Sequence, residues 1–314
     1  MAYWLALVAF AAAAAAQAQP ATLRVMGFAG SANWPIFVAQ EKALFAARGL
    51  KVELTPAPNS TTQIAVLRDG QIDIALTAMD NIVPYPDELF AFLGLNDGGR
   101  ISLVAAPGIK RVAELKDQAL AVDAIASGYA FVLMEMLARG GLSPGDYLLV
   151  SVGGSRERLR ALQERRASAA LLNAPTDAAA EAAGFVRLAS SAEVLRNYQG
   201  SVGAARRTWA RQHGDALVRY IGAHLAALDW LHAPANRSEA LQLLERRLGI
   251  DARGAERSYT ELLAQGSLAR KAALDVEGIR AVLALRSRFA PSPPPSSDPA
   301  RYYDLSYYEK ALAR

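Results

Sequence analysis

Residues 25–50, VMGFAGSANWPIFVAQEKALFAARGL, decide the fold class of this chain. A β-prone apolar run at residues 23–26 leads into small or turn-forming residues at 27–33, which cannot continue a strand. Pro35 suits the first turn of a helix, where its missing N–H is no loss, and Gly49 suits the position just after a helix. The stretch therefore predicts a strand, a loop and a helix that ends just before Gly49.

The junction between this strand and this helix is a candidate ligand site. Unpaired N–H groups at a helix N-terminus point at whatever lies above the end of the strand. Phe28 and Trp34 flank this point and can hold a flat ligand between them, while Ser31 and Asn33 add polar groups. A plain strand-to-helix turn with two core aromatic residues is the alternative, because such turns are common in α/β proteins.

Length and composition allow a two-domain protein with a large core. The chain has 314 residues, 52% of them hydrophobic, and no cysteine. The absence of cysteine excludes disulfides, a thiol nucleophile and a lipid-modified cysteine, and a chain of this size needs no disulfide for stability. The 34 Lys and Arg residues are scattered among 30 Asp and Glu, so we expect no nucleic-acid partner.

The N-terminal segment indicates export. Residues 1–16 are uncharged and mostly apolar, and residues 16–18, AQA, have the form of a signal-peptidase site. We interpret residues 1–18 as a secretory signal peptide, although no Lys or Arg precedes the apolar run. An N-terminal membrane anchor is the alternative, but the run is short for a transmembrane span.

An alternation of strands and helices continues to about residue 205. Strands are expected at 51–54, 72–76, 89–95, 101–106, 119–122, 148–152 and 169–172, and helices at 63–68, 112–116, 129–138, 155–164 and after 176. The strands at 89–95 and 101–106 flank an expected turn at 96–99. Two α/β units in series predict two lobes.

From residue 208 onward the pattern is helical. Helices are expected at 215–231, 238–248, 253–263 and 276–288. Residues 290–299 are rich in Pro and Ser and predict an extended link. The four tyrosines at 302, 303, 307 and 308 are expected to pack on a lobe.

Few residues suit catalysis. His213, His224 and His232 have a spacing that fits no metal motif, so we expect them to be solvated or to cap helices. The chain has no nucleophile elbow, P-loop or dinucleotide fingerprint. We therefore expect a binding protein with no metal and no cofactor; an exported hydrolase is the alternative from another class.

Polar and aromatic residues follow several of the expected strands. Ligands of open α/β sheets bind outside the carboxyl ends of the strands. The candidate ligand-binding residues are Phe28, Ser31, Asn33, Trp34, Thr77, Asp80, Asn81, Asp123, Ser127, Tyr129, Arg156 and Asn173. Ser155 and Thr176 are as compatible with helix caps as with ligand contacts, and Asp80 and Asp123 are the sharper candidates, with an N-cap role as their alternative.

Residues 27–54, GFAGSANWPIFVAQEKALFAARGLKVEL, resemble the start of ABC-transporter substrate-binding proteins of the sulfonate, taurine, nitrate and thiamine-pyrimidine-precursor family. The family pattern appears here as Pro35, Ala39, Phe45, Gly49-Leu50, Val52 and Glu53, with Ala43 in place of the usual glycine. Residues 67–81, LRDGQIDIALTAMDN, and 112–123, VAELKDQALAVD, continue the resemblance. The Cys- and His-bearing motif of the pyrimidine-synthesising relatives is missing.

The resemblance implies a type II periplasmic-binding-protein fold, in which two α/β lobes joined by two crossovers close on a small ligand. The crossovers are expected near residues 103–107 and 198–205. The expected organisation is a signal peptide at 1–18, a first lobe at 19–104 and 205–314 with a helical C-terminal extension, and a second lobe at 105–204.

The resemblance also implies a periplasmic monomer that delivers its ligand to an ABC permease in the inner membrane; a binding subunit without a permease is the alternative. The first three strand-end loops contain no Lys or Arg but contain Asp80 and Asp123, and Arg156 is the nearest cation. Carboxylates repel an anion, so we favour a nitrogen-bearing aromatic ligand such as a pyrimidine. An aliphatic sulfonate, taurine or nitrate is the alternative.

Overall fold

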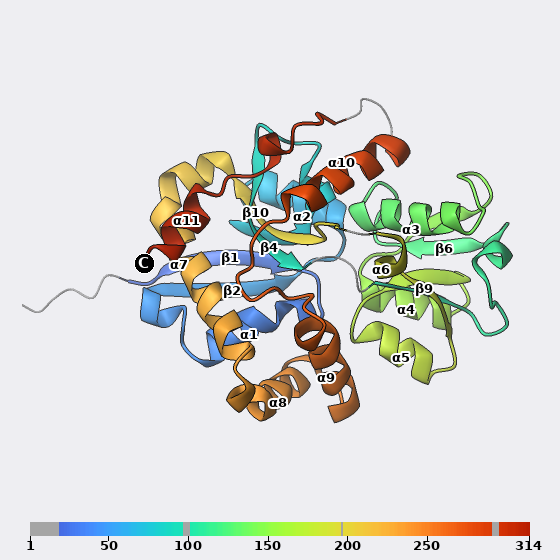
Figure 1. Ribbon diagram of the computed structural model, residues 1–314, viewed down its shortest axis with the longest axis horizontal. Coiled ribbons are helices and arrows are strands. Elements are labelled where there is room, and N and C mark those ends of the chain that lie inside the picture. Colours follow the sequence, from blue (N-terminus) through green and yellow to red (C-terminus); the bar gives the residue numbers. More distant parts are fainter. Residues whose placement is uncertain (1–18, 97–100, 196, 291–294) are drawn as a thin grey trace, which may run out of the picture.

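Two sheets of five strands each, covered by helices, form two lobes that lie side by side (Figure 1). The computed structural model describes residues 19–96, 101–195, 197–290 and 295–314. The expected signal peptide and the middle of the Pro/Ser link lie outside the described residues. The two-lobed α/β fold expected from the sequence is confirmed, and within the described part of the chain no helix is long and apolar enough to cross a membrane.

Both sheets have the same arrangement: three parallel strands followed by one strand that runs antiparallel to its two neighbours. The first sheet has the order β2 (Leu50–Pro56), β1 (Ala21–Gly27), β3 (Ile74–Ala78), β10 (Ser201–Arg206) and β4 (Leu89–Asn96). The second has the order β7 (Leu148–Ser151), β6 (Ala119–Val122), β8 (Ala169–Leu172), β5 (Ser102–Ala105) and β9 (Val186–Ser190). Parallel strands place their carboxyl ends along one edge, so each sheet offers its strand-end loops to the region between the lobes.

The chain crosses between the sheets twice. It leaves the first sheet after Asn96 and enters the second at Ser102, which is earlier than the expected 103–107. The strands β4 and β5 therefore belong to different sheets, and residues 97–99 of the turn expected between them lie outside the described residues. The return falls between Ser190 and Ser201, close to the expected region. The strands β9 and β10 were not predicted, because their Ala, Ser and Gly residues carry a weak β signal.

The first helix, α1 (Trp34–Glu41), ends earlier than predicted. Ala43 has a φ of 54°, a left-handed conformation that interrupts the helix, and only a 3-10 turn at Ala46–Arg48 follows before Gly49. Ala43 stands where the resembling family usually has glycine, and glycine adopts this conformation without steric cost. The local geometry thus explains both the early helix end and the family pattern.

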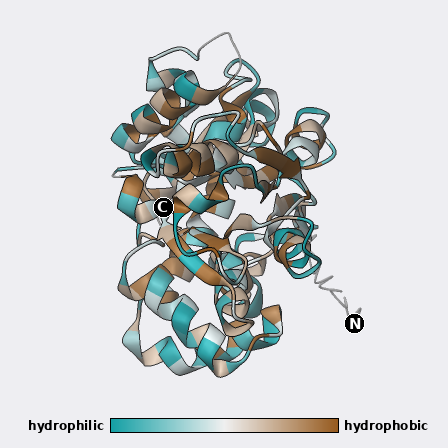
Figure 2. Cartoon of the chain, turned by 90° about the vertical axis from the view of Figure 1, so that its right-hand side faces the viewer, coloured by the Kyte–Doolittle hydropathy of each residue, from teal (hydrophilic) through white to brown (hydrophobic). Residues whose placement is uncertain are grey.

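Helices cover both faces of each sheet. On the first sheet, α1, α7 (Arg207–Leu231) and α8 (Arg237–Leu248) pack on one face, and α2 (Ser60–Arg68) and α10 (Val276–Phe289) on the other. On the second sheet, α3 (Gly128–Arg139) packs on one face and α4 (Ser155–Gln163) and α5 (Thr176–Ala182) on the other. The helices carry hydrophilic and hydrophobic residues on different sides (Figure 2). One apolar cluster continues from lobe to lobe where α10 packs against α3.

The C-terminal helices lie where they were predicted, except that α7 begins at Arg207 and not at the expected residue 215. The helix α9 (Ala252–Tyr259) continues into a π-helix at Thr260–Ala264, and α6 (Ser191–Val194) and α11 (Ser306–Leu312) are short. The tyrosine tail docks on the first lobe, as expected: Tyr302 and Tyr308 are buried, and the Tyr308 hydroxyl donates to the carbonyl of Lys271. His224 is buried in α7 beside Tyr220, so the expectation of a solvated or capping role is wrong for this histidine.

Candidate ligand-binding site

A cavity of about 100 Å³ lies between the lobes at the ends of the strands. Of the residues expected at the site, those that line it are Phe28, Ser31, Asn33, Thr77, Asn81, Asp123, Ser127, Tyr129 and Asn173. Both lobes contribute to its wall, which is the placement expected for a ligand of two open α/β sheets. This volume limits a ligand enclosed between the lobes to a small molecule.

The loop after β1 is held by its own side chains. The Asn33 amide Nδ2 donates to the carbonyl of Phe28 at 2.8 Å, which fixes the aromatic ring beside the cavity. Gly27 lets the strand end pack closely against this loop, because a Cβ there would lie 3.1 Å from Asn33 Oδ1 and 3.2 Å from a Leu76 methyl group. The buried hydroxyls of Ser31 and Ser258 are 2.9 Å apart and connect the loop to α9.

The two lobes contact each other directly around the cavity. The Asn81 Oδ1 accepts from the backbone N–H of Gly128 at 3.1 Å, and its Nδ2 donates to Thr77 Oγ1 at 2.9 Å. The hydroxyls of Tyr129 and Ser201 are 3.0 Å apart. These contacts join the start of α3 in the second lobe to β3, its following turn and β10 in the first lobe.

Asp123 accepts hydrogen bonds from both lobes. Its Oδ1 accepts from Ser127 Oγ at 2.5 Å, and its Oδ2 accepts from the N–H of Ser60, the first residue of α2, at 3.3 Å. The N-cap of α3 is Ser127, whose hydroxyl accepts from the N–H of Ala130. The N-cap alternative for Asp123 is therefore wrong, while Ser127 serves as a cap and also lines the cavity.

Trp34 and Asp80 do not reach the cavity. The Trp34 side chain is fully buried, and its Nε1–H donates to the carbonyl of Ala240 in α8 at 3.1 Å. Asp80 pairs with Arg286 of α10 at 2.7 Å. Burial raises the pKa of Asp80 to about 6, against the opposite effect of Arg286. Both side chains thus pack against C-terminal helices instead of facing a ligand.

Arg158, and not Arg156, supplies the cation at the site. Arg156 is exposed, whereas Arg158 is buried and lines the cavity. The Arg158 Nε donates to the carbonyl of Leu171 at 2.7 Å and its Nη1 to that of Gly153 at 3.0 Å. Burial lowers the pKa of Arg158, and the nearby Asp123 acts in the opposite direction.

Helical spacing was the signal that could have found Arg158. In a helix that begins at Ser155, residues 158, 161 and 162 share the face that packs on the sheet, and Ala161 and Leu162 are buried there. Ser155 also lines the cavity, and its Oγ lies 2.5 Å from Thr176 Oγ1. Gly154 and Pro175 hold the N-cap positions, so Ser155 and Thr176 connect two strand-end loops and are not caps.

The C-terminal segment also contributes to the cavity wall. Glu261 and Leu262 of the π-helix line the cavity, together with Ser267. None of these three was predicted, because nothing in a helical sequence tail shows that it folds back over a distant cleft. Among the described residues, no three His, Asp or Glu side chains gather where they could hold a metal ion.

Two lobes of this topology with a cavity between them define the fold of ABC-type periplasmic binding proteins. Similar structures include a protein of Bordetella bronchiseptica RB50 (18% identity, TM-score 0.80, covering 94% of this chain and 98% of that one). The periplasmic nitrate-binding protein NrtA from Synechocystis PCC 6803 is also similar (16% identity, TM-score 0.80, 93% and 88%). So is the alkanesulfonate-binding protein SsuA from Xanthomonas axonopodis pv. citri bound to MOPS (19% identity, TM-score 0.72, 88% and 96%).

At the level of sequence, the family model of the NMT1-like family matches residues 16–245, and the chain belongs to that family. The resemblance to ABC-transporter substrate-binding proteins is thereby confirmed. Among proteins with curated functions, none matches the chain significantly. These solved structures share the fold of this chain, but at 16–19% identity they do not identify its ligand.

Proposed function

We propose that this chain is a periplasmic solute-binding protein that captures a small organic ligand between its lobes and delivers it to an ABC permease. The observation that carries the proposal is the cavity lined by strand-end loops of both lobes. The fold shared with the nitrate- and alkanesulfonate-binding proteins supports it. In this proposal residues 1–18 direct export and the mature protein acts as a monomer.

The same proposal includes a division of the chain at the two crossovers. The sheet membership of β5 and β10 supports a first lobe made of residues 19–96 and 201–314 and a second lobe made of residues 102–190. These boundaries lie a few residues before the expected ones at 104 and 204. The shift assigns β5 to the second lobe and all of β10 to the first.

For the ligand, we propose a nitrogen-bearing aromatic molecule such as a pyrimidine. Phe28 and Tyr129 offer aromatic surface in the cavity, and the Asp123 carboxylate can accept further hydrogen bonds from ring N–H or amino groups. Asn173 adds a side-chain amide at the cavity wall. Trp34 and Asp80, which also favoured this ligand class in the sequence, no longer support it.

An organic or inorganic anion is the second candidate, and Arg158 is the observation that favours it. Backbone carbonyls hold the Nε and Nη1 of this guanidinium inside the cavity wall. A charge that is fixed in this way needs no rearrangement to bind a sulfonate, a carboxylate or nitrate. Asp123 opposes such a ligand through its negative charge.

Calorimetric titration with a pyrimidine, an alkanesulfonate and nitrate, each against the wild-type protein, tests the proposal. Asp123→Asn is expected to weaken pyrimidine binding about tenfold or more, because a hydrogen bond to a charged acceptor is lost. Arg158→Gln, with exposed Arg156→Gln as its matched control, reports on anion binding. Sulfonate or nitrate binding that survives Asp123→Asn and disappears in Arg158→Gln would show that the anion is the ligand class.

An exported hydrolase has little support at this site. None of the three histidines lines the cavity: His224 is buried within α7, and the Nε2 of His232 lies 2.9 Å from the carbonyl of Leu268. A serine nucleophile near the cavity would need a general base within hydrogen-bond reach. The hydroxyls of Ser31 and Ser155 lie within hydrogen-bond distance of other hydroxyls. Ser127 donates to the Asp123 carboxylate, which also accepts from the N–H of Ser60 in the other lobe.

A further inference from the structure

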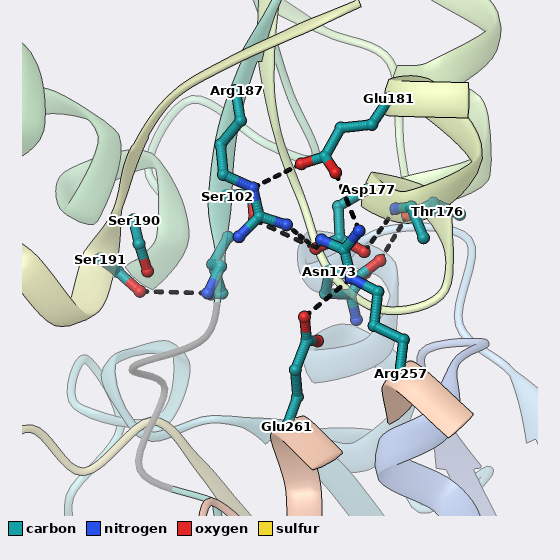
Figure 3. A network of polar contacts seen from close by, with 12 residues as sticks. Ser102, Asn173, Thr176, Asp177, Glu181, Arg187, Ser190, Ser191, Arg257 and Glu261 are labelled. Carbon is teal, nitrogen blue, oxygen red and sulfur yellow. Dashed lines mark hydrogen bonds and ion pairs between the residues drawn. The ribbon is translucent and has the colours of Figure 1, made fainter. Parts of the chain in front are cut away.

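Beside the cavity, Arg257 of α9 pairs with three carboxylates, two of which belong to the other lobe (Figure 3). Its Nη1 lies 2.8 Å from Glu181 Oε2 and its Nη2 lies 3.4 Å from Asp177 Oδ2, both on α5 of the second lobe. Its Nε lies 2.9 Å from Glu261 Oε1, one helical turn further along its own segment. One guanidinium therefore contacts the opposite lobe and the cavity wall at the same time.

The acceptors on the second lobe are held in place by their own lobe. The Asp177 carboxylate is buried and accepts from Ser102 Oγ of β5 at 3.0 Å. Arg187 of β9 bonds both Asp177 at 3.2 Å and Glu181 at 2.5 Å. Burial raises the pKa of Asp177, and Arg257 acts in the opposite direction. The second lobe thus presents a preformed acidic site to Arg257.

The segment that carries Arg257 is also part of the ligand cavity. Ser258, the next residue, contacts Ser31 at 2.9 Å, and Ser31 lines the cavity. Glu261 and Leu262 line it from the π-helix, a kind of segment that often occurs at functional sites. Movement of α9 away from α5 would therefore change the cavity wall as well as break the ion pairs.

We propose that residues 252–264 form a latch, in which Arg257 holds the lobes closed by binding the Asp177 and Glu181 carboxylates. The proposal rests on the proposed function, because closure matters here as the means of retaining a ligand. The ion pairs are partly exposed, with 28% of the Arg257 side chain and 32% of the Glu181 side chain accessible, so salt screens them. The closed fraction consequently falls as ionic strength rises.

At a second contact between the lobes, α10 of the first lobe meets α3 of the second. There α10 packs on α3 through apolar side chains, and the exposed Arg288 pairs with Glu135. Apolar contacts respond little to moderate salt, so any salt dependence at this contact comes from the Arg288–Glu135 pair. Arg288→Gln removes the second ionic contact between the lobes and serves as a comparison for Arg257→Gln.

The natural sequence has no cysteine, which allows two labels to be placed without any other change. Gln163→Cys on α4 and Ser238→Cys on α8 are exposed positions on opposite lobes. Spin labels there give the distribution of interlobe distances in the ligand-free full chain, between low salt and 1 M NaCl. This measurement needs no ligand, so it tests whether Arg257 holds the lobes closed even if no tested compound binds.

Arg257→Gln is expected to raise the ratio of open to closed molecules roughly five- to thirtyfold and to reduce its salt dependence to the part that the Arg288–Glu135 pair contributes. Arg253→Gln, an exposed arginine on the same helix, is the matched control and should change neither. Glu181→Gln removes the shorter of the two contacts from the second lobe and leaves the pair with Asp177, so it should open the protein less than Arg257→Gln, and the double variant should open no further than Arg257→Gln alone.

Equal distance distributions for Arg257→Gln and Arg253→Gln would overturn the latch. So would a salt dependence that persists in Arg257→Gln and disappears in Arg288→Gln. If Arg257→Gln unfolds, Glu181→Gln, which leaves α9 unchanged, decides the question by the same readout. If none of the tested ligands binds in calorimetry but closure still depends on salt through Arg257, the proposed ligand classes are rejected and the latch is supported.

Discussion

The Nε of Arg158 in α4 donates to the carbonyl of Leu171 in β8 at 2.7 Å, and this bond turns a residue of a charged helix into part of a cavity wall. The carbonyl of Gly153 accepts a hydrogen bond from the Nη1 of the same guanidinium at 3.0 Å. The strand β8 and the loop after β7 are therefore tied to one side chain, which gives Arg158 a structural role in addition to any contact with ligand.

Loss of this side chain should destabilise the protein. Arg158→Met leaves two buried carbonyls without their donor, at a cost of roughly 1–3 kcal/mol in the free energy of unfolding. Arg156→Met on the exposed face of the same helix should change it by less than about 0.5 kcal/mol. Urea denaturation measures both, and equal stabilities would contradict the role assigned to Arg158.

Trp34 should prove to be a core residue. Trp34→Phe removes the hydrogen bond to the Ala240 carbonyl and leaves space in the core where the indole ring packed, so the free energy of unfolding is expected to fall by about 1–3 kcal/mol. Ligand affinity should stay unchanged, since the ring does not line the cavity. Calorimetry of Trp34→Phe beside Phe28→Ala distinguishes the two aromatic residues: only the second should lose affinity.

The backbone contact between the lobes at Gly128 should tolerate no side chain. A Cβ on Gly128 would lie 2.7 Å from the Cβ of Asp80 in the first lobe. Gly128→Ala is therefore expected to favour the open form, seen as a larger radius of gyration in small-angle scattering. Gly222→Ala within α7 is the control, because its nearest neighbour would be a flexible arginine side chain at 3.4 Å. Identical radii for both variants would contradict the closure geometry.

Acid should destabilise the fold through His224. Burial lowers the pKa of His224 to about 4, whereas the unfolded chain binds this proton near pH 6.5. The unfolded state therefore binds more protons between these pH values, and stability falls as pH drops from about 6.5 towards 4. The loss approaches roughly 3 kcal/mol, from 1.36 kcal/mol per pKa unit.

A comparison of wild type with His224→Phe at pH 7 and pH 5 isolates this effect. Asp80 changes the stability in the opposite direction. Because burial raises its pKa to about 6, its protonation below that pH relieves an unfavourable buried charge and stabilises the fold. That contribution is present in both proteins and cancels in the difference. The variant should lose less stability than wild type on acidification; an equal loss would show that His224 is not the responsible group.

Ligand should close the lobes and protect the fold. Two crossovers between sheets are typical of hinge closure, and a ligand that binds only the folded protein raises the melting temperature by mass action. Scattering with and without saturating ligand measures the radius, and thermal unfolding measures the melting temperature. An unchanged radius together with a raised melting temperature would indicate binding without hinge motion.

Local patterns in the sequence predicted most of the strand, loop and helix order. The segment from β1 to α1 and the left-handed Gly49 that follows it depend on neighbours a few residues away, and they are visible in the sequence. The left-handed Ala43 was not visible, because alanine gives no sign of that conformation. The weak strands β9 and β10 exist because neighbouring strands pair with them.

The sequence predicted most of the cavity-lining residues at the strand ends, and it missed the positions that contacts with distant helices determine. Trp34 and Asp80 meet Ala240 and Arg286, which lie far along the chain on α8 and α10. No pattern near either residue indicates that these helices will cover it. Arg158 differs, because the period of α4 itself places it on the buried face.

The position of β10 has a consequence for the order in which the protein can form. This strand lies between β3 and β4, so the first sheet lacks an interior strand until the chain has been made as far as Arg206. The second sheet, by contrast, is complete once β9 has been synthesised. During synthesis from the N-terminus, the first lobe therefore completes its sheet after the second lobe. The edge strand β4 can join the first sheet only when β10, which follows the second lobe in the chain, has been made.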